Sequence, residues 1–122
     1  MIEIEDRDLD VLLAGDPGGP VVMLNLLRFR PDGGMESYQR YADALGAGIN
    51  ARYGLQVEYL GAGGRALVAE DGQAWDMVVL VRYPNRQAFV DMIRDPEYRA
   101  VAHLRSEALV EAVLQPTSPM GV

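Results

Sequence analysis

Two nearly unbroken apolar runs, at residues 21–29 and 75–83, form the strongest pattern in the chain. Continuous apolar runs of this length are typical of strands that are covered on both faces. Turn residues follow the first run at Pro31–Gly34 and the second at Pro84–Asn85. Because glycine and proline end regular structure, we predict two central strands at these positions.

Apolar residues recur with helical spacing in three further stretches. Closely spaced leucines predict a short leading helix over residues 6–14. A longer stripe predicts a helix over about 38–54, and another predicts a helix that begins after Asn85. Pro96 interrupts this last helix, because proline fits the first turn of a helix better than its interior, so a further segment is expected over 96–107. The residues of that segment expected to face inward are Tyr98, Val101 and Ala102.

Weaker patterns predict the two edge strands. Val57 and Tyr59 alternate with polar residues, which indicates a strand covered on one face. The glycine-rich stretch 61–64 should bend this strand before residues 66–69 resume an extended pattern, which predicts a long, kinked edge ribbon. An apolar run at residues 109–114 predicts the fourth strand.

The order of these elements defines the fold class. Apart from the leading helix it is β-α-β-β-α-β, the pattern of a ferredoxin-like α+β domain. Right-handed crossovers then require an antiparallel four-stranded sheet, ordered 4-1-3-2 by strand number, with two helices on one face. We divide the chain into an N-terminal helix and linker (residues 1–19), the ferredoxin-like domain (20–116) and a C-terminal tail (117–122).

The second face of this sheet has no predicted cover. Both central strands carry apolar side chains at odd and even positions, so a single copy would expose a large apolar surface. Two sheets that pair face to face about a two-fold axis would remove that surface. We therefore predict a homodimer, with a second copy of the chain as the main partner.

Composition narrows the possible functions. The formal net charge of −7 opposes binding to nucleic acid, and no apolar run approaches the roughly 20 residues that a membrane helix needs. The acidic start of the chain does not resemble a secretory signal, so a cytoplasmic location is expected. There is no cysteine and all 11 basic residues are arginine, which excludes disulfides, thiolate chemistry and a Schiff-base lysine.

Histidine and serine are too scarce for several common kinds of site. His103 is the single histidine in the sequence, so a multi-histidine metal centre cannot form within one protomer. No serine lies in a G-x-S-x-G motif, which disfavours a serine hydrolase. We therefore expect neither a metal site nor a cofactor.

Two blocks of the sequence together resemble a known family. The first block comprises Val22–Phe29, Gly34, Ser37, Tyr38 and Tyr41, and the second comprises Trp75–Val78, Tyr83–Phe89, Asp95–Tyr98 and His103–Arg105. Over residues 20–116 these motifs resemble the domain family DUF1330, of the dimeric α/β-barrel type. Where that family has serine as a helix cap and glutamate after the arginine, this chain has Asn85 and Gln87. The resemblance implies a ferredoxin-like dimer but no particular reaction, because fold alone does not define function.

The expected topology gathers polar side chains at one end of the sheet. They are Asn25, Arg28, Tyr38, Tyr41, Trp75, Asp76, His103 and Arg105, whereas Arg82 and Tyr83 are expected at the opposite end. We select His103 as the candidate general acid or base, because imidazole transfers protons readily near neutral pH. The candidate ligand-binding residues are Asn25, Arg28, Tyr41, Trp75 and Arg105.

Each candidate also has a structural interpretation. Asn25 could bond neighbouring backbone, because a buried amide needs a partner. Arg28 could pair with Asp76 or Glu36, and His103 could simply end a helix, where the helix dipole favours it. The aromatic candidates could belong to the core or to a dimer interface, and the arginine of the last helix could bind a carboxylate or C-terminal carbonyl groups.

Three functions are compatible with this pattern. The first is a cofactor-independent enzyme, an isomerase or a monooxygenase, that acts on a small acidic or aromatic compound. Monooxygenases of the dimeric α/β-barrel type carry Asn, Trp and His in the order that Asn25, Trp75 and His103 repeat, although His103 would lie at the far end of its helix. The other two are a non-catalytic ligand-binding dimer and a protein-interaction module.

Overall fold

The structure, a computed structural model, describes residues 2–121. Its helices are α1 (Asp6–Ala14), α2 (Gly34–Ala44), α3 (Asn50–Tyr53), α4 (Arg86–Arg94) and α5 (Pro96–Ala108), and a π-helical turn, η1 (Leu45–Ile49), joins α2 to α3. Its strands are β1 (Val21–Phe29), β2 (Gln56–Ala62), β3 (Met77–Tyr83) and β4 (Leu109–Thr117). The expected order of strands and helices is therefore present. The break predicted at Pro96 separates α4 from α5, and the helix predicted over 38–54 is divided into α2, η1 and α3.

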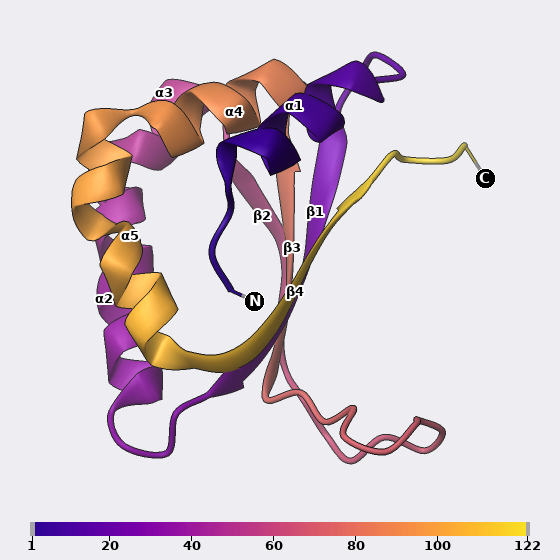
Figure 1. Cartoon of the computed structure of the whole chain (residues 1–122), viewed down its shortest axis with the longest axis vertical. Coiled ribbons are helices and arrows are strands. Elements are labelled where there is room, and N and C mark those ends of the chain that lie inside the picture. Colours follow the sequence, from indigo (N-terminus) through magenta and orange to yellow (C-terminus); the bar gives the residue numbers. More distant parts are fainter. Residues whose placement is uncertain (1, 122) are drawn as a thin grey trace.

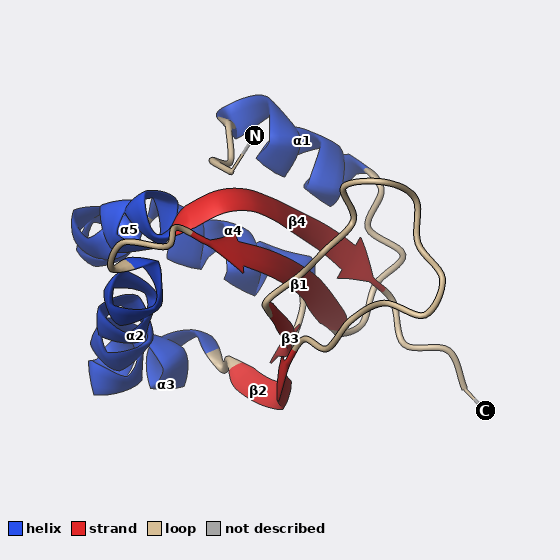
Figure 2. Ribbon diagram, turned by 90° about the horizontal axis from the view of Figure 1, so that it is seen from below, coloured by secondary structure: helices blue, strands red, loops and turns tan. Residues whose placement is uncertain are grey.

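The strands form one antiparallel sheet in the order β2-β3-β1-β4. This is the predicted order 4-1-3-2 read from the other edge, so the ferredoxin-like fold class is confirmed. Helices α2, α4 and α5 cover one face of the sheet, and α1 lies beside α4 (Figure 1). No helix of residues 2–121 covers the opposite face, which we call the open face (Figures 1 and 2).

Successive side chains of β1 point to opposite faces of the sheet. The side chains that point toward the helices are buried: Val21, Met23, Asn25, Leu27 and Phe29. The apolar side chains that point to the open face are partly exposed: Val22, Leu24 and Leu26. The apolar run of β1 is suited to a strand that is buried on both faces of the sheet. A single protomer covers only one of these faces.

The edge ribbon predicted for residues 66–69 is wrong. After β2 the chain leaves the sheet and forms the β2–β3 loop, residues 63–76, which projects on the open-face side (Figure 1). Gly63 N donates a hydrogen bond to Asp76 O at 2.8 Å and so closes the base of the loop. A Cβ atom on Gly63 would lie only 1.9 Å from Trp75 O. Glycine therefore ends the strand here because the two backbones approach too closely for any side chain.

Three predicted boundaries also shift. The helix expected over 38–54 is divided by η1, where the backbone of Gly48 is not helical, in keeping with the low helix propensity of glycine. β3 begins at Met77, two residues later than predicted. β4 continues to Thr117, whose hydroxyl donates to Val22 O at 2.6 Å and holds the strand end on β1.

Apolar side chains fill the space between the sheet and the helices. The larger buried cluster includes Leu9 and Leu12 of α1, so the leading helix is part of the same core. A smaller cluster surrounds Leu27 and Leu109 at the other end of the sheet. Within residues 2–121, every helix is too short or too polar to cross a membrane.

Candidate functional site

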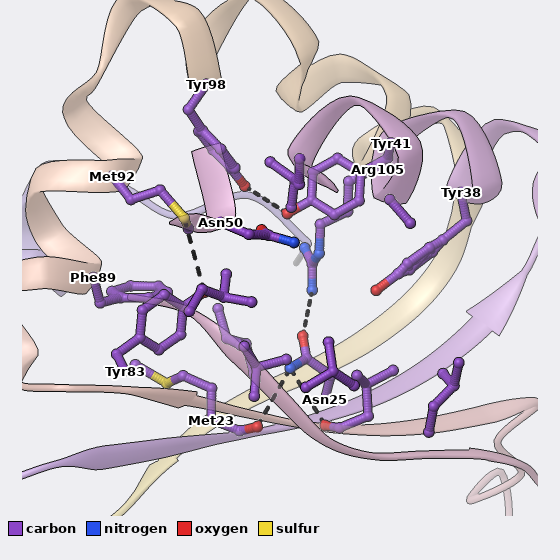
Figure 3. A pocket seen from close by; sticks show the side chains of 18 of the residues that line it. Met23, Asn25, Tyr38, Tyr41, Asn50, Tyr83, Phe89, Met92, Tyr98 and Arg105 are labelled. Carbon is purple, nitrogen blue, oxygen red and sulfur yellow. Dashed lines mark hydrogen bonds between the residues drawn. The ribbon is translucent and has the colours of Figure 1, made fainter. Parts of the chain in front are cut away.

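A cavity of about 240 Å³ lies between the sheet and the helices (Figure 3). The residues of its floor include Met23 and Asn25 of β1, and Val79, Val81 and Tyr83 of β3. The residues of its walls include Tyr38 and Tyr41 of α2, Asn50 of α3, Phe89 and Met92 of α4, and Tyr98 and Arg105 of α5. A mostly apolar cavity with a few converging polar groups is the usual form of a small-molecule site.

The cavity opens between α2 and β2. Three of its lining residues are large exposed hydrophobic side chains, Met35 (51% exposed), Val57 (56%) and Leu60 (61%). On the opposite side the partly buried side chains of Ile4 and Leu114 close it. An apolar mouth therefore leads inward to a polar centre.

Arg105 supplies the positive charge of this centre, and the other described lining residues are neutral. Its side chain is buried, with 8% of the residue exposed. Arg105 Nη1 donates to Ile2 O at 3.1 Å and Nη2 donates to Asn25 Oδ1 at 3.4 Å. The carboxylate or C-terminal carbonyls predicted as its partners are therefore wrong, and no ion pair within residues 2–121 includes it. Such an unpaired buried charge is costly, and an anionic ligand would offset that cost.

Asn25 lies on the cavity floor directly below Arg105 (Figure 3). Its Nδ2 lies 3.5 Å from Met23 O and 3.5 Å from Val79 O, which are long distances for hydrogen bonds. Its Oδ1 accepts the bond from Arg105. The Asn25 amide therefore contacts neighbouring backbone carbonyls, as its structural interpretation predicts, and it also orients the Arg105 guanidinium.

The tyrosines around Arg105 are hydrogen-bond donors at neutral pH. The hydroxyl oxygens of Tyr41 and Tyr98 lie 3.0 Å apart and share a hydrogen bond. Burial raises the pKa of Tyr41 well above its usual value, and Tyr98 adds to the rise while Arg105 opposes it. Burial likewise raises the pKa of Tyr38 and of Tyr83. Protonated phenols beside a guanidinium form an environment that favours an oxyanion.

Arg28 and Trp75 lie outside the cavity, at the base of the β2–β3 loop. Arg28 Nη1 donates to two carbonyl groups of the loop at 3.1 Å and 3.2 Å, and its guanidinium carbon lies 5.6 Å from the centre of the Trp75 ring. Arg28 also pairs with Glu111 of β4, so the pairing predicted with Asp76 or Glu36 is wrong. Arg28 and Trp75 could therefore bind a ligand only at the base of the β2–β3 loop, and this role remains a prediction.

His103 also lies apart from the cavity. It is exposed on α5 and lines a groove that the N-terminal segment forms beside that helix. Arg105 also borders this groove, but of the two residues only Arg105 reaches the cavity as well. A general acid or base role for His103 remains a prediction for the groove.

The cavity also contains residues that the sequence did not select. Tyr83 is expected at the opposite end of the sheet from Asn25, yet it lines the same cavity, because the cavity extends along β1 and β3. Tyr98 is expected only as an inward-facing residue, and Asn50 was not singled out. The sequence does contain a signal for Asn50. Ile49 belongs to the apolar stripe of its helix, so the next residue lies near the core.

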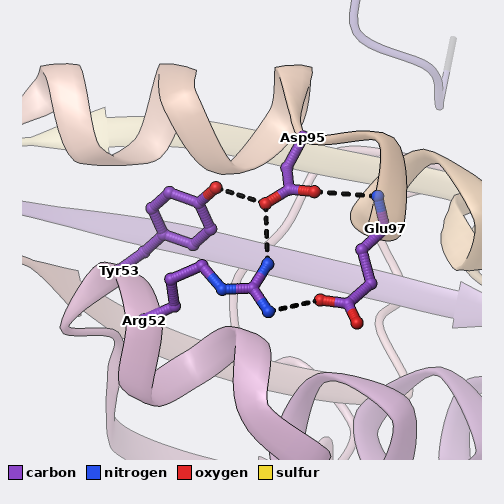
Figure 4. Close-up of polar contacts among 4 residues, drawn as sticks. All are labelled: Arg52, Tyr53, Asp95 and Glu97. Carbon is purple, nitrogen blue, oxygen red and sulfur yellow. Dashed lines mark hydrogen bonds and ion pairs between the residues drawn. The ribbon is translucent and has the colours of Figure 1, made fainter.

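A polar cluster fixes α3 against the start of α5 (Figure 4). Arg52 Nη1 lies 2.8 Å from Asp95 Oδ2 and Arg52 Nη2 lies 2.6 Å from Glu97 Oε2. Tyr53 also donates to Asp95, which in turn caps α5 by accepting the N–H of Glu97 at 2.8 Å. The Tyr53 hydrogen bond is the largest cause that lowers the pKa of Asp95. The cluster therefore holds in place the short helix that carries Asn50.

The acidic residues do not gather into a metal-binding group. Among residues 2–121, no three or more Asp, Glu or His side chains lie close enough together to hold a metal ion. The candidate site is therefore the cavity around Arg105.

Comparison with known proteins identifies a family and a similar crystal structure whose descriptions state no reaction. The family described as "Domain of unknown function (DUF1330)" matches residues 33–115. A crystal structure of a protein of unknown function from Rhodopseudomonas palustris is 32% identical, with a TM-score of 0.90, and the match covers 99% of this chain and 98% of that one. No curated protein matches the chain significantly.

Two more distant crystal structures share the fold alone. One is a dimeric ferredoxin-like protein of unknown function from Jannaschia, 10% identical with a TM-score of 0.63, covering 83% of this chain and 100% of that one. The other is described as a candidate antibiotic biosynthesis monooxygenase from Bacteroides thetaiotaomicron. It is 17% identical with a TM-score of 0.59, covering 83% of this chain and 90% of that one.

Proposed function

Because the chain belongs to the DUF1330 family, whose description states no reaction, we propose a function from the cavity: each protomer binds a small organic acid through Arg105. One observation carries this proposal. Arg105 is buried in a cavity whose other described lining residues are neutral, and its two acceptors are neutral as well. Attraction between opposite charges is much stronger in such a low-dielectric site than in water, so a carboxylate would bind preferentially.

The size of the cavity limits the ligand. An apolar cavity of about 150 Å³ can hold benzene, so a cavity of about 240 Å³ has room for one ring and a carboxylate. The apolar mouth formed by Met35, Val57 and Leu60 suits an aromatic or short aliphatic body. The acid–base groups among the described lining residues are phenols, and burial raises the pKa of Tyr38, Tyr41 and Tyr83, which favours binding over acid–base catalysis.

The binding unit in this proposal is a homodimer that pairs through the open faces. Apolar side chains of β1 and β3 point to that face, and Leu67 and Val68 of the β2–β3 loop on the same side are 100% and 95% exposed. Burial of such a surface against a second copy would stabilise the pair. The description of the Jannaschia neighbour as dimeric supports a dimer, without naming the faces that pair.

Calorimetric titration with benzoate tests ligand binding. We expect saturable binding to the wild-type protein and its loss in Arg105→Met, which keeps an unbranched stem but removes the guanidinium group and its charge. Arg86→Met is the matched control, because Arg86 is also poorly exposed but lies outside the cavity and bonds Leu12 O at 2.9 Å. Equal affinity of Arg105→Met and wild type, or binding of neutral benzamide as tight as that of benzoate, would contradict the proposal.

A further inference from the structure

The amide of Asn50 is the feature of the cavity that carboxylate binding leaves unexplained. It extends from α3 into the cavity, with its nitrogen end toward Arg105 (Figure 3). Its Oδ1 is buried and has no hydrogen-bond partner within residues 2–121. Buried polar atoms of native proteins are nearly always hydrogen-bonded, so an unpaired one indicates a partner outside the chain.

The other polar groups of the cavity are chiefly donors. Arg105 offers N–H groups, and the Tyr41 and Tyr98 hydroxyls keep one proton free after they share their mutual hydrogen bond. These groups suit the oxygen atoms of a carboxylate. Asn50 Oδ1 is an acceptor, so it requires a donor from the ligand.

The position of Asn50 is fixed rather than adaptable. Its backbone carbonyl accepts the N–H of Leu55 at 2.9 Å, and the Arg52–Asp95 pair holds the helix from outside. An acceptor that is held in place in the same cavity as an anion-binding guanidinium can distinguish ligands by the position of a hydroxyl group. A ligand without the donor would leave the acceptor unpaired.

We propose that the ligand is a hydroxylated carboxylic acid whose acid group binds Arg105 and whose hydroxyl group donates to Asn50 Oδ1. This inference rests on the proposed function, because Arg105 supplies the anchor. It adds the chemical class of the ligand: a compact acid that carries a neutral hydrogen-bond donor, with an aromatic ring as the body that best fills the apolar remainder of the cavity.

Titration with benzoate and its 2-, 3- and 4-hydroxy derivatives tests the class. We expect at least one hydroxybenzoate to bind the wild-type protein roughly tenfold more tightly than benzoate. Asn50→Leu should abolish this preference and bind benzoate at least as well as the wild type does. Asn50→Ala provides a second variant if leucine disturbs the cavity. Gln39→Leu is the control, because Gln39 also lines the cavity but is exposed, and its Nε2 donates to Asp43 Oδ1 at 3.0 Å, so the preference should persist.

The results separate this inference from the proposed function. If no hydroxybenzoate binds more tightly than benzoate, or if the preference survives in both Asn50 variants, the role of Asn50 is wrong. Benzoate binding that Arg105→Met abolishes would then still support the proposed function. If none of the four acids binds in a manner that depends on Arg105, both proposals are wrong.

Discussion

At the scale of single residues, Arg105 differs from a typical structural arginine in the partners that it has. A structural arginine is normally paired with a carboxylate, because desolvation of the guanidinium must be offset. Arg105 instead bonds an amide oxygen and a backbone carbonyl in a mostly apolar cavity. The fold therefore gains little from its charge.

This contrast predicts how stability responds to the loss of the charge. Arg105→Met should change the free energy of unfolding by less than about 1 kcal/mol, because removal of an unpaired buried charge offsets the loss of its bonds to Ile2 O and Asn25 Oδ1. Arg86→Met should lower it by about 1–3 kcal/mol, because Arg86 bonds Leu12 O and lies near Asp16. Urea unfolding followed by circular dichroism measures both. A loss for Arg105→Met as large as that for Arg86→Met would indicate a structural role.

The buried tyrosines predict a loss of stability at high pH. Burial raises the pKa of Tyr41, so above about pH 10 the unfolded chain loses the phenolic proton while the folded protein keeps it. The folded state then binds more protons than the unfolded state, and the free energy of unfolding falls as pH rises. Tyr41→Phe should reduce that fall between pH 9 and pH 11. Tyr59→Phe, at an exposed position, is the control, and an equal slope in wild type and Tyr41→Phe would refute the prediction.

The sequence already contains the signal for Arg105 in the pattern of its helix. Arg105 follows Tyr98 by seven residues, two turns of helix, and so lies on the same inward-facing side. A charged residue on an apolar stripe points to a functional position. His103 lies off that stripe, so it borders the neighbouring groove together with Arg105 but does not line the cavity.

At the scale of elements, the short helix α3 depends on polar contacts with the start of α5. Asp95 accepts hydrogen bonds from Arg52 and Tyr53 and also caps α5. Asp95→Asn keeps an oxygen for the cap and removes the charge, whereas Asp95→Ala removes both. We therefore expect the thermal midpoint at pH 7 to fall in the order wild type, Asp95→Asn, Asp95→Ala.

The pH dependence of this series provides a further check. The pKa of Asp95 is lowered in the folded protein, so its contribution is present above about pH 4 and disappears as pH falls through the folded-state pKa. The difference between wild type and Asp95→Asn should therefore shrink on going from pH 7 to pH 3 in thermal scans. A difference that stays constant would show that the charge of Asp95 does not contribute.

Adjacent glycines provide a matched test of the loop base. A methyl group on Gly63 would meet the Trp75 carbonyl, whereas one on Gly64 would meet nothing within 4 Å. We expect Gly63→Ala to lower the free energy of unfolding by about 1–3 kcal/mol and Gly64→Ala to change it by less than about 0.5 kcal/mol. Chemical denaturation of the two variants measures the difference. Equal effects would mean that the close backbone contact is not maintained in solution.

Sequence patterns predicted the regular elements more reliably than the segments between them. The β1 run and the leading helix have the predicted bounds, because hydrophobic periodicity reports directly on burial. The extended ribbon at residues 66–69 was wrong, because short apolar residues after a run of glycines fit a loop as well as a strand. The break at η1 depends on glycine within a helical stripe, which periodicity alone does not detect.

At the scale of the whole molecule, the two faces of the sheet have different tasks. The helix-covered face holds the cavity with Asn25 and Arg105, and the open face carries the apolar side chains that remain. This division follows from the two-residue period of a strand, because neighbouring residues of β1 serve opposite faces. The sequence could predict the division and the strand order, but not the cavity, because its depth depends on how the side chains of four helices pack.

The open face yields the last prediction, which concerns assembly. Leu24 of β1 and Leu80 of β3 are cross-strand neighbours on this face and are partly exposed. If two copies pair through it, a charge at its centre would be buried without a partner in the dimer, at a cost of several kcal/mol. We expect sedimentation velocity to show a dimer of the 13.4 kDa chain at micromolar concentration and Leu24→Glu to shift it to monomer. Val11→Glu, at an exposed position of α1, should leave the dimer intact, and a dimeric Leu24→Glu protein would place the interface elsewhere.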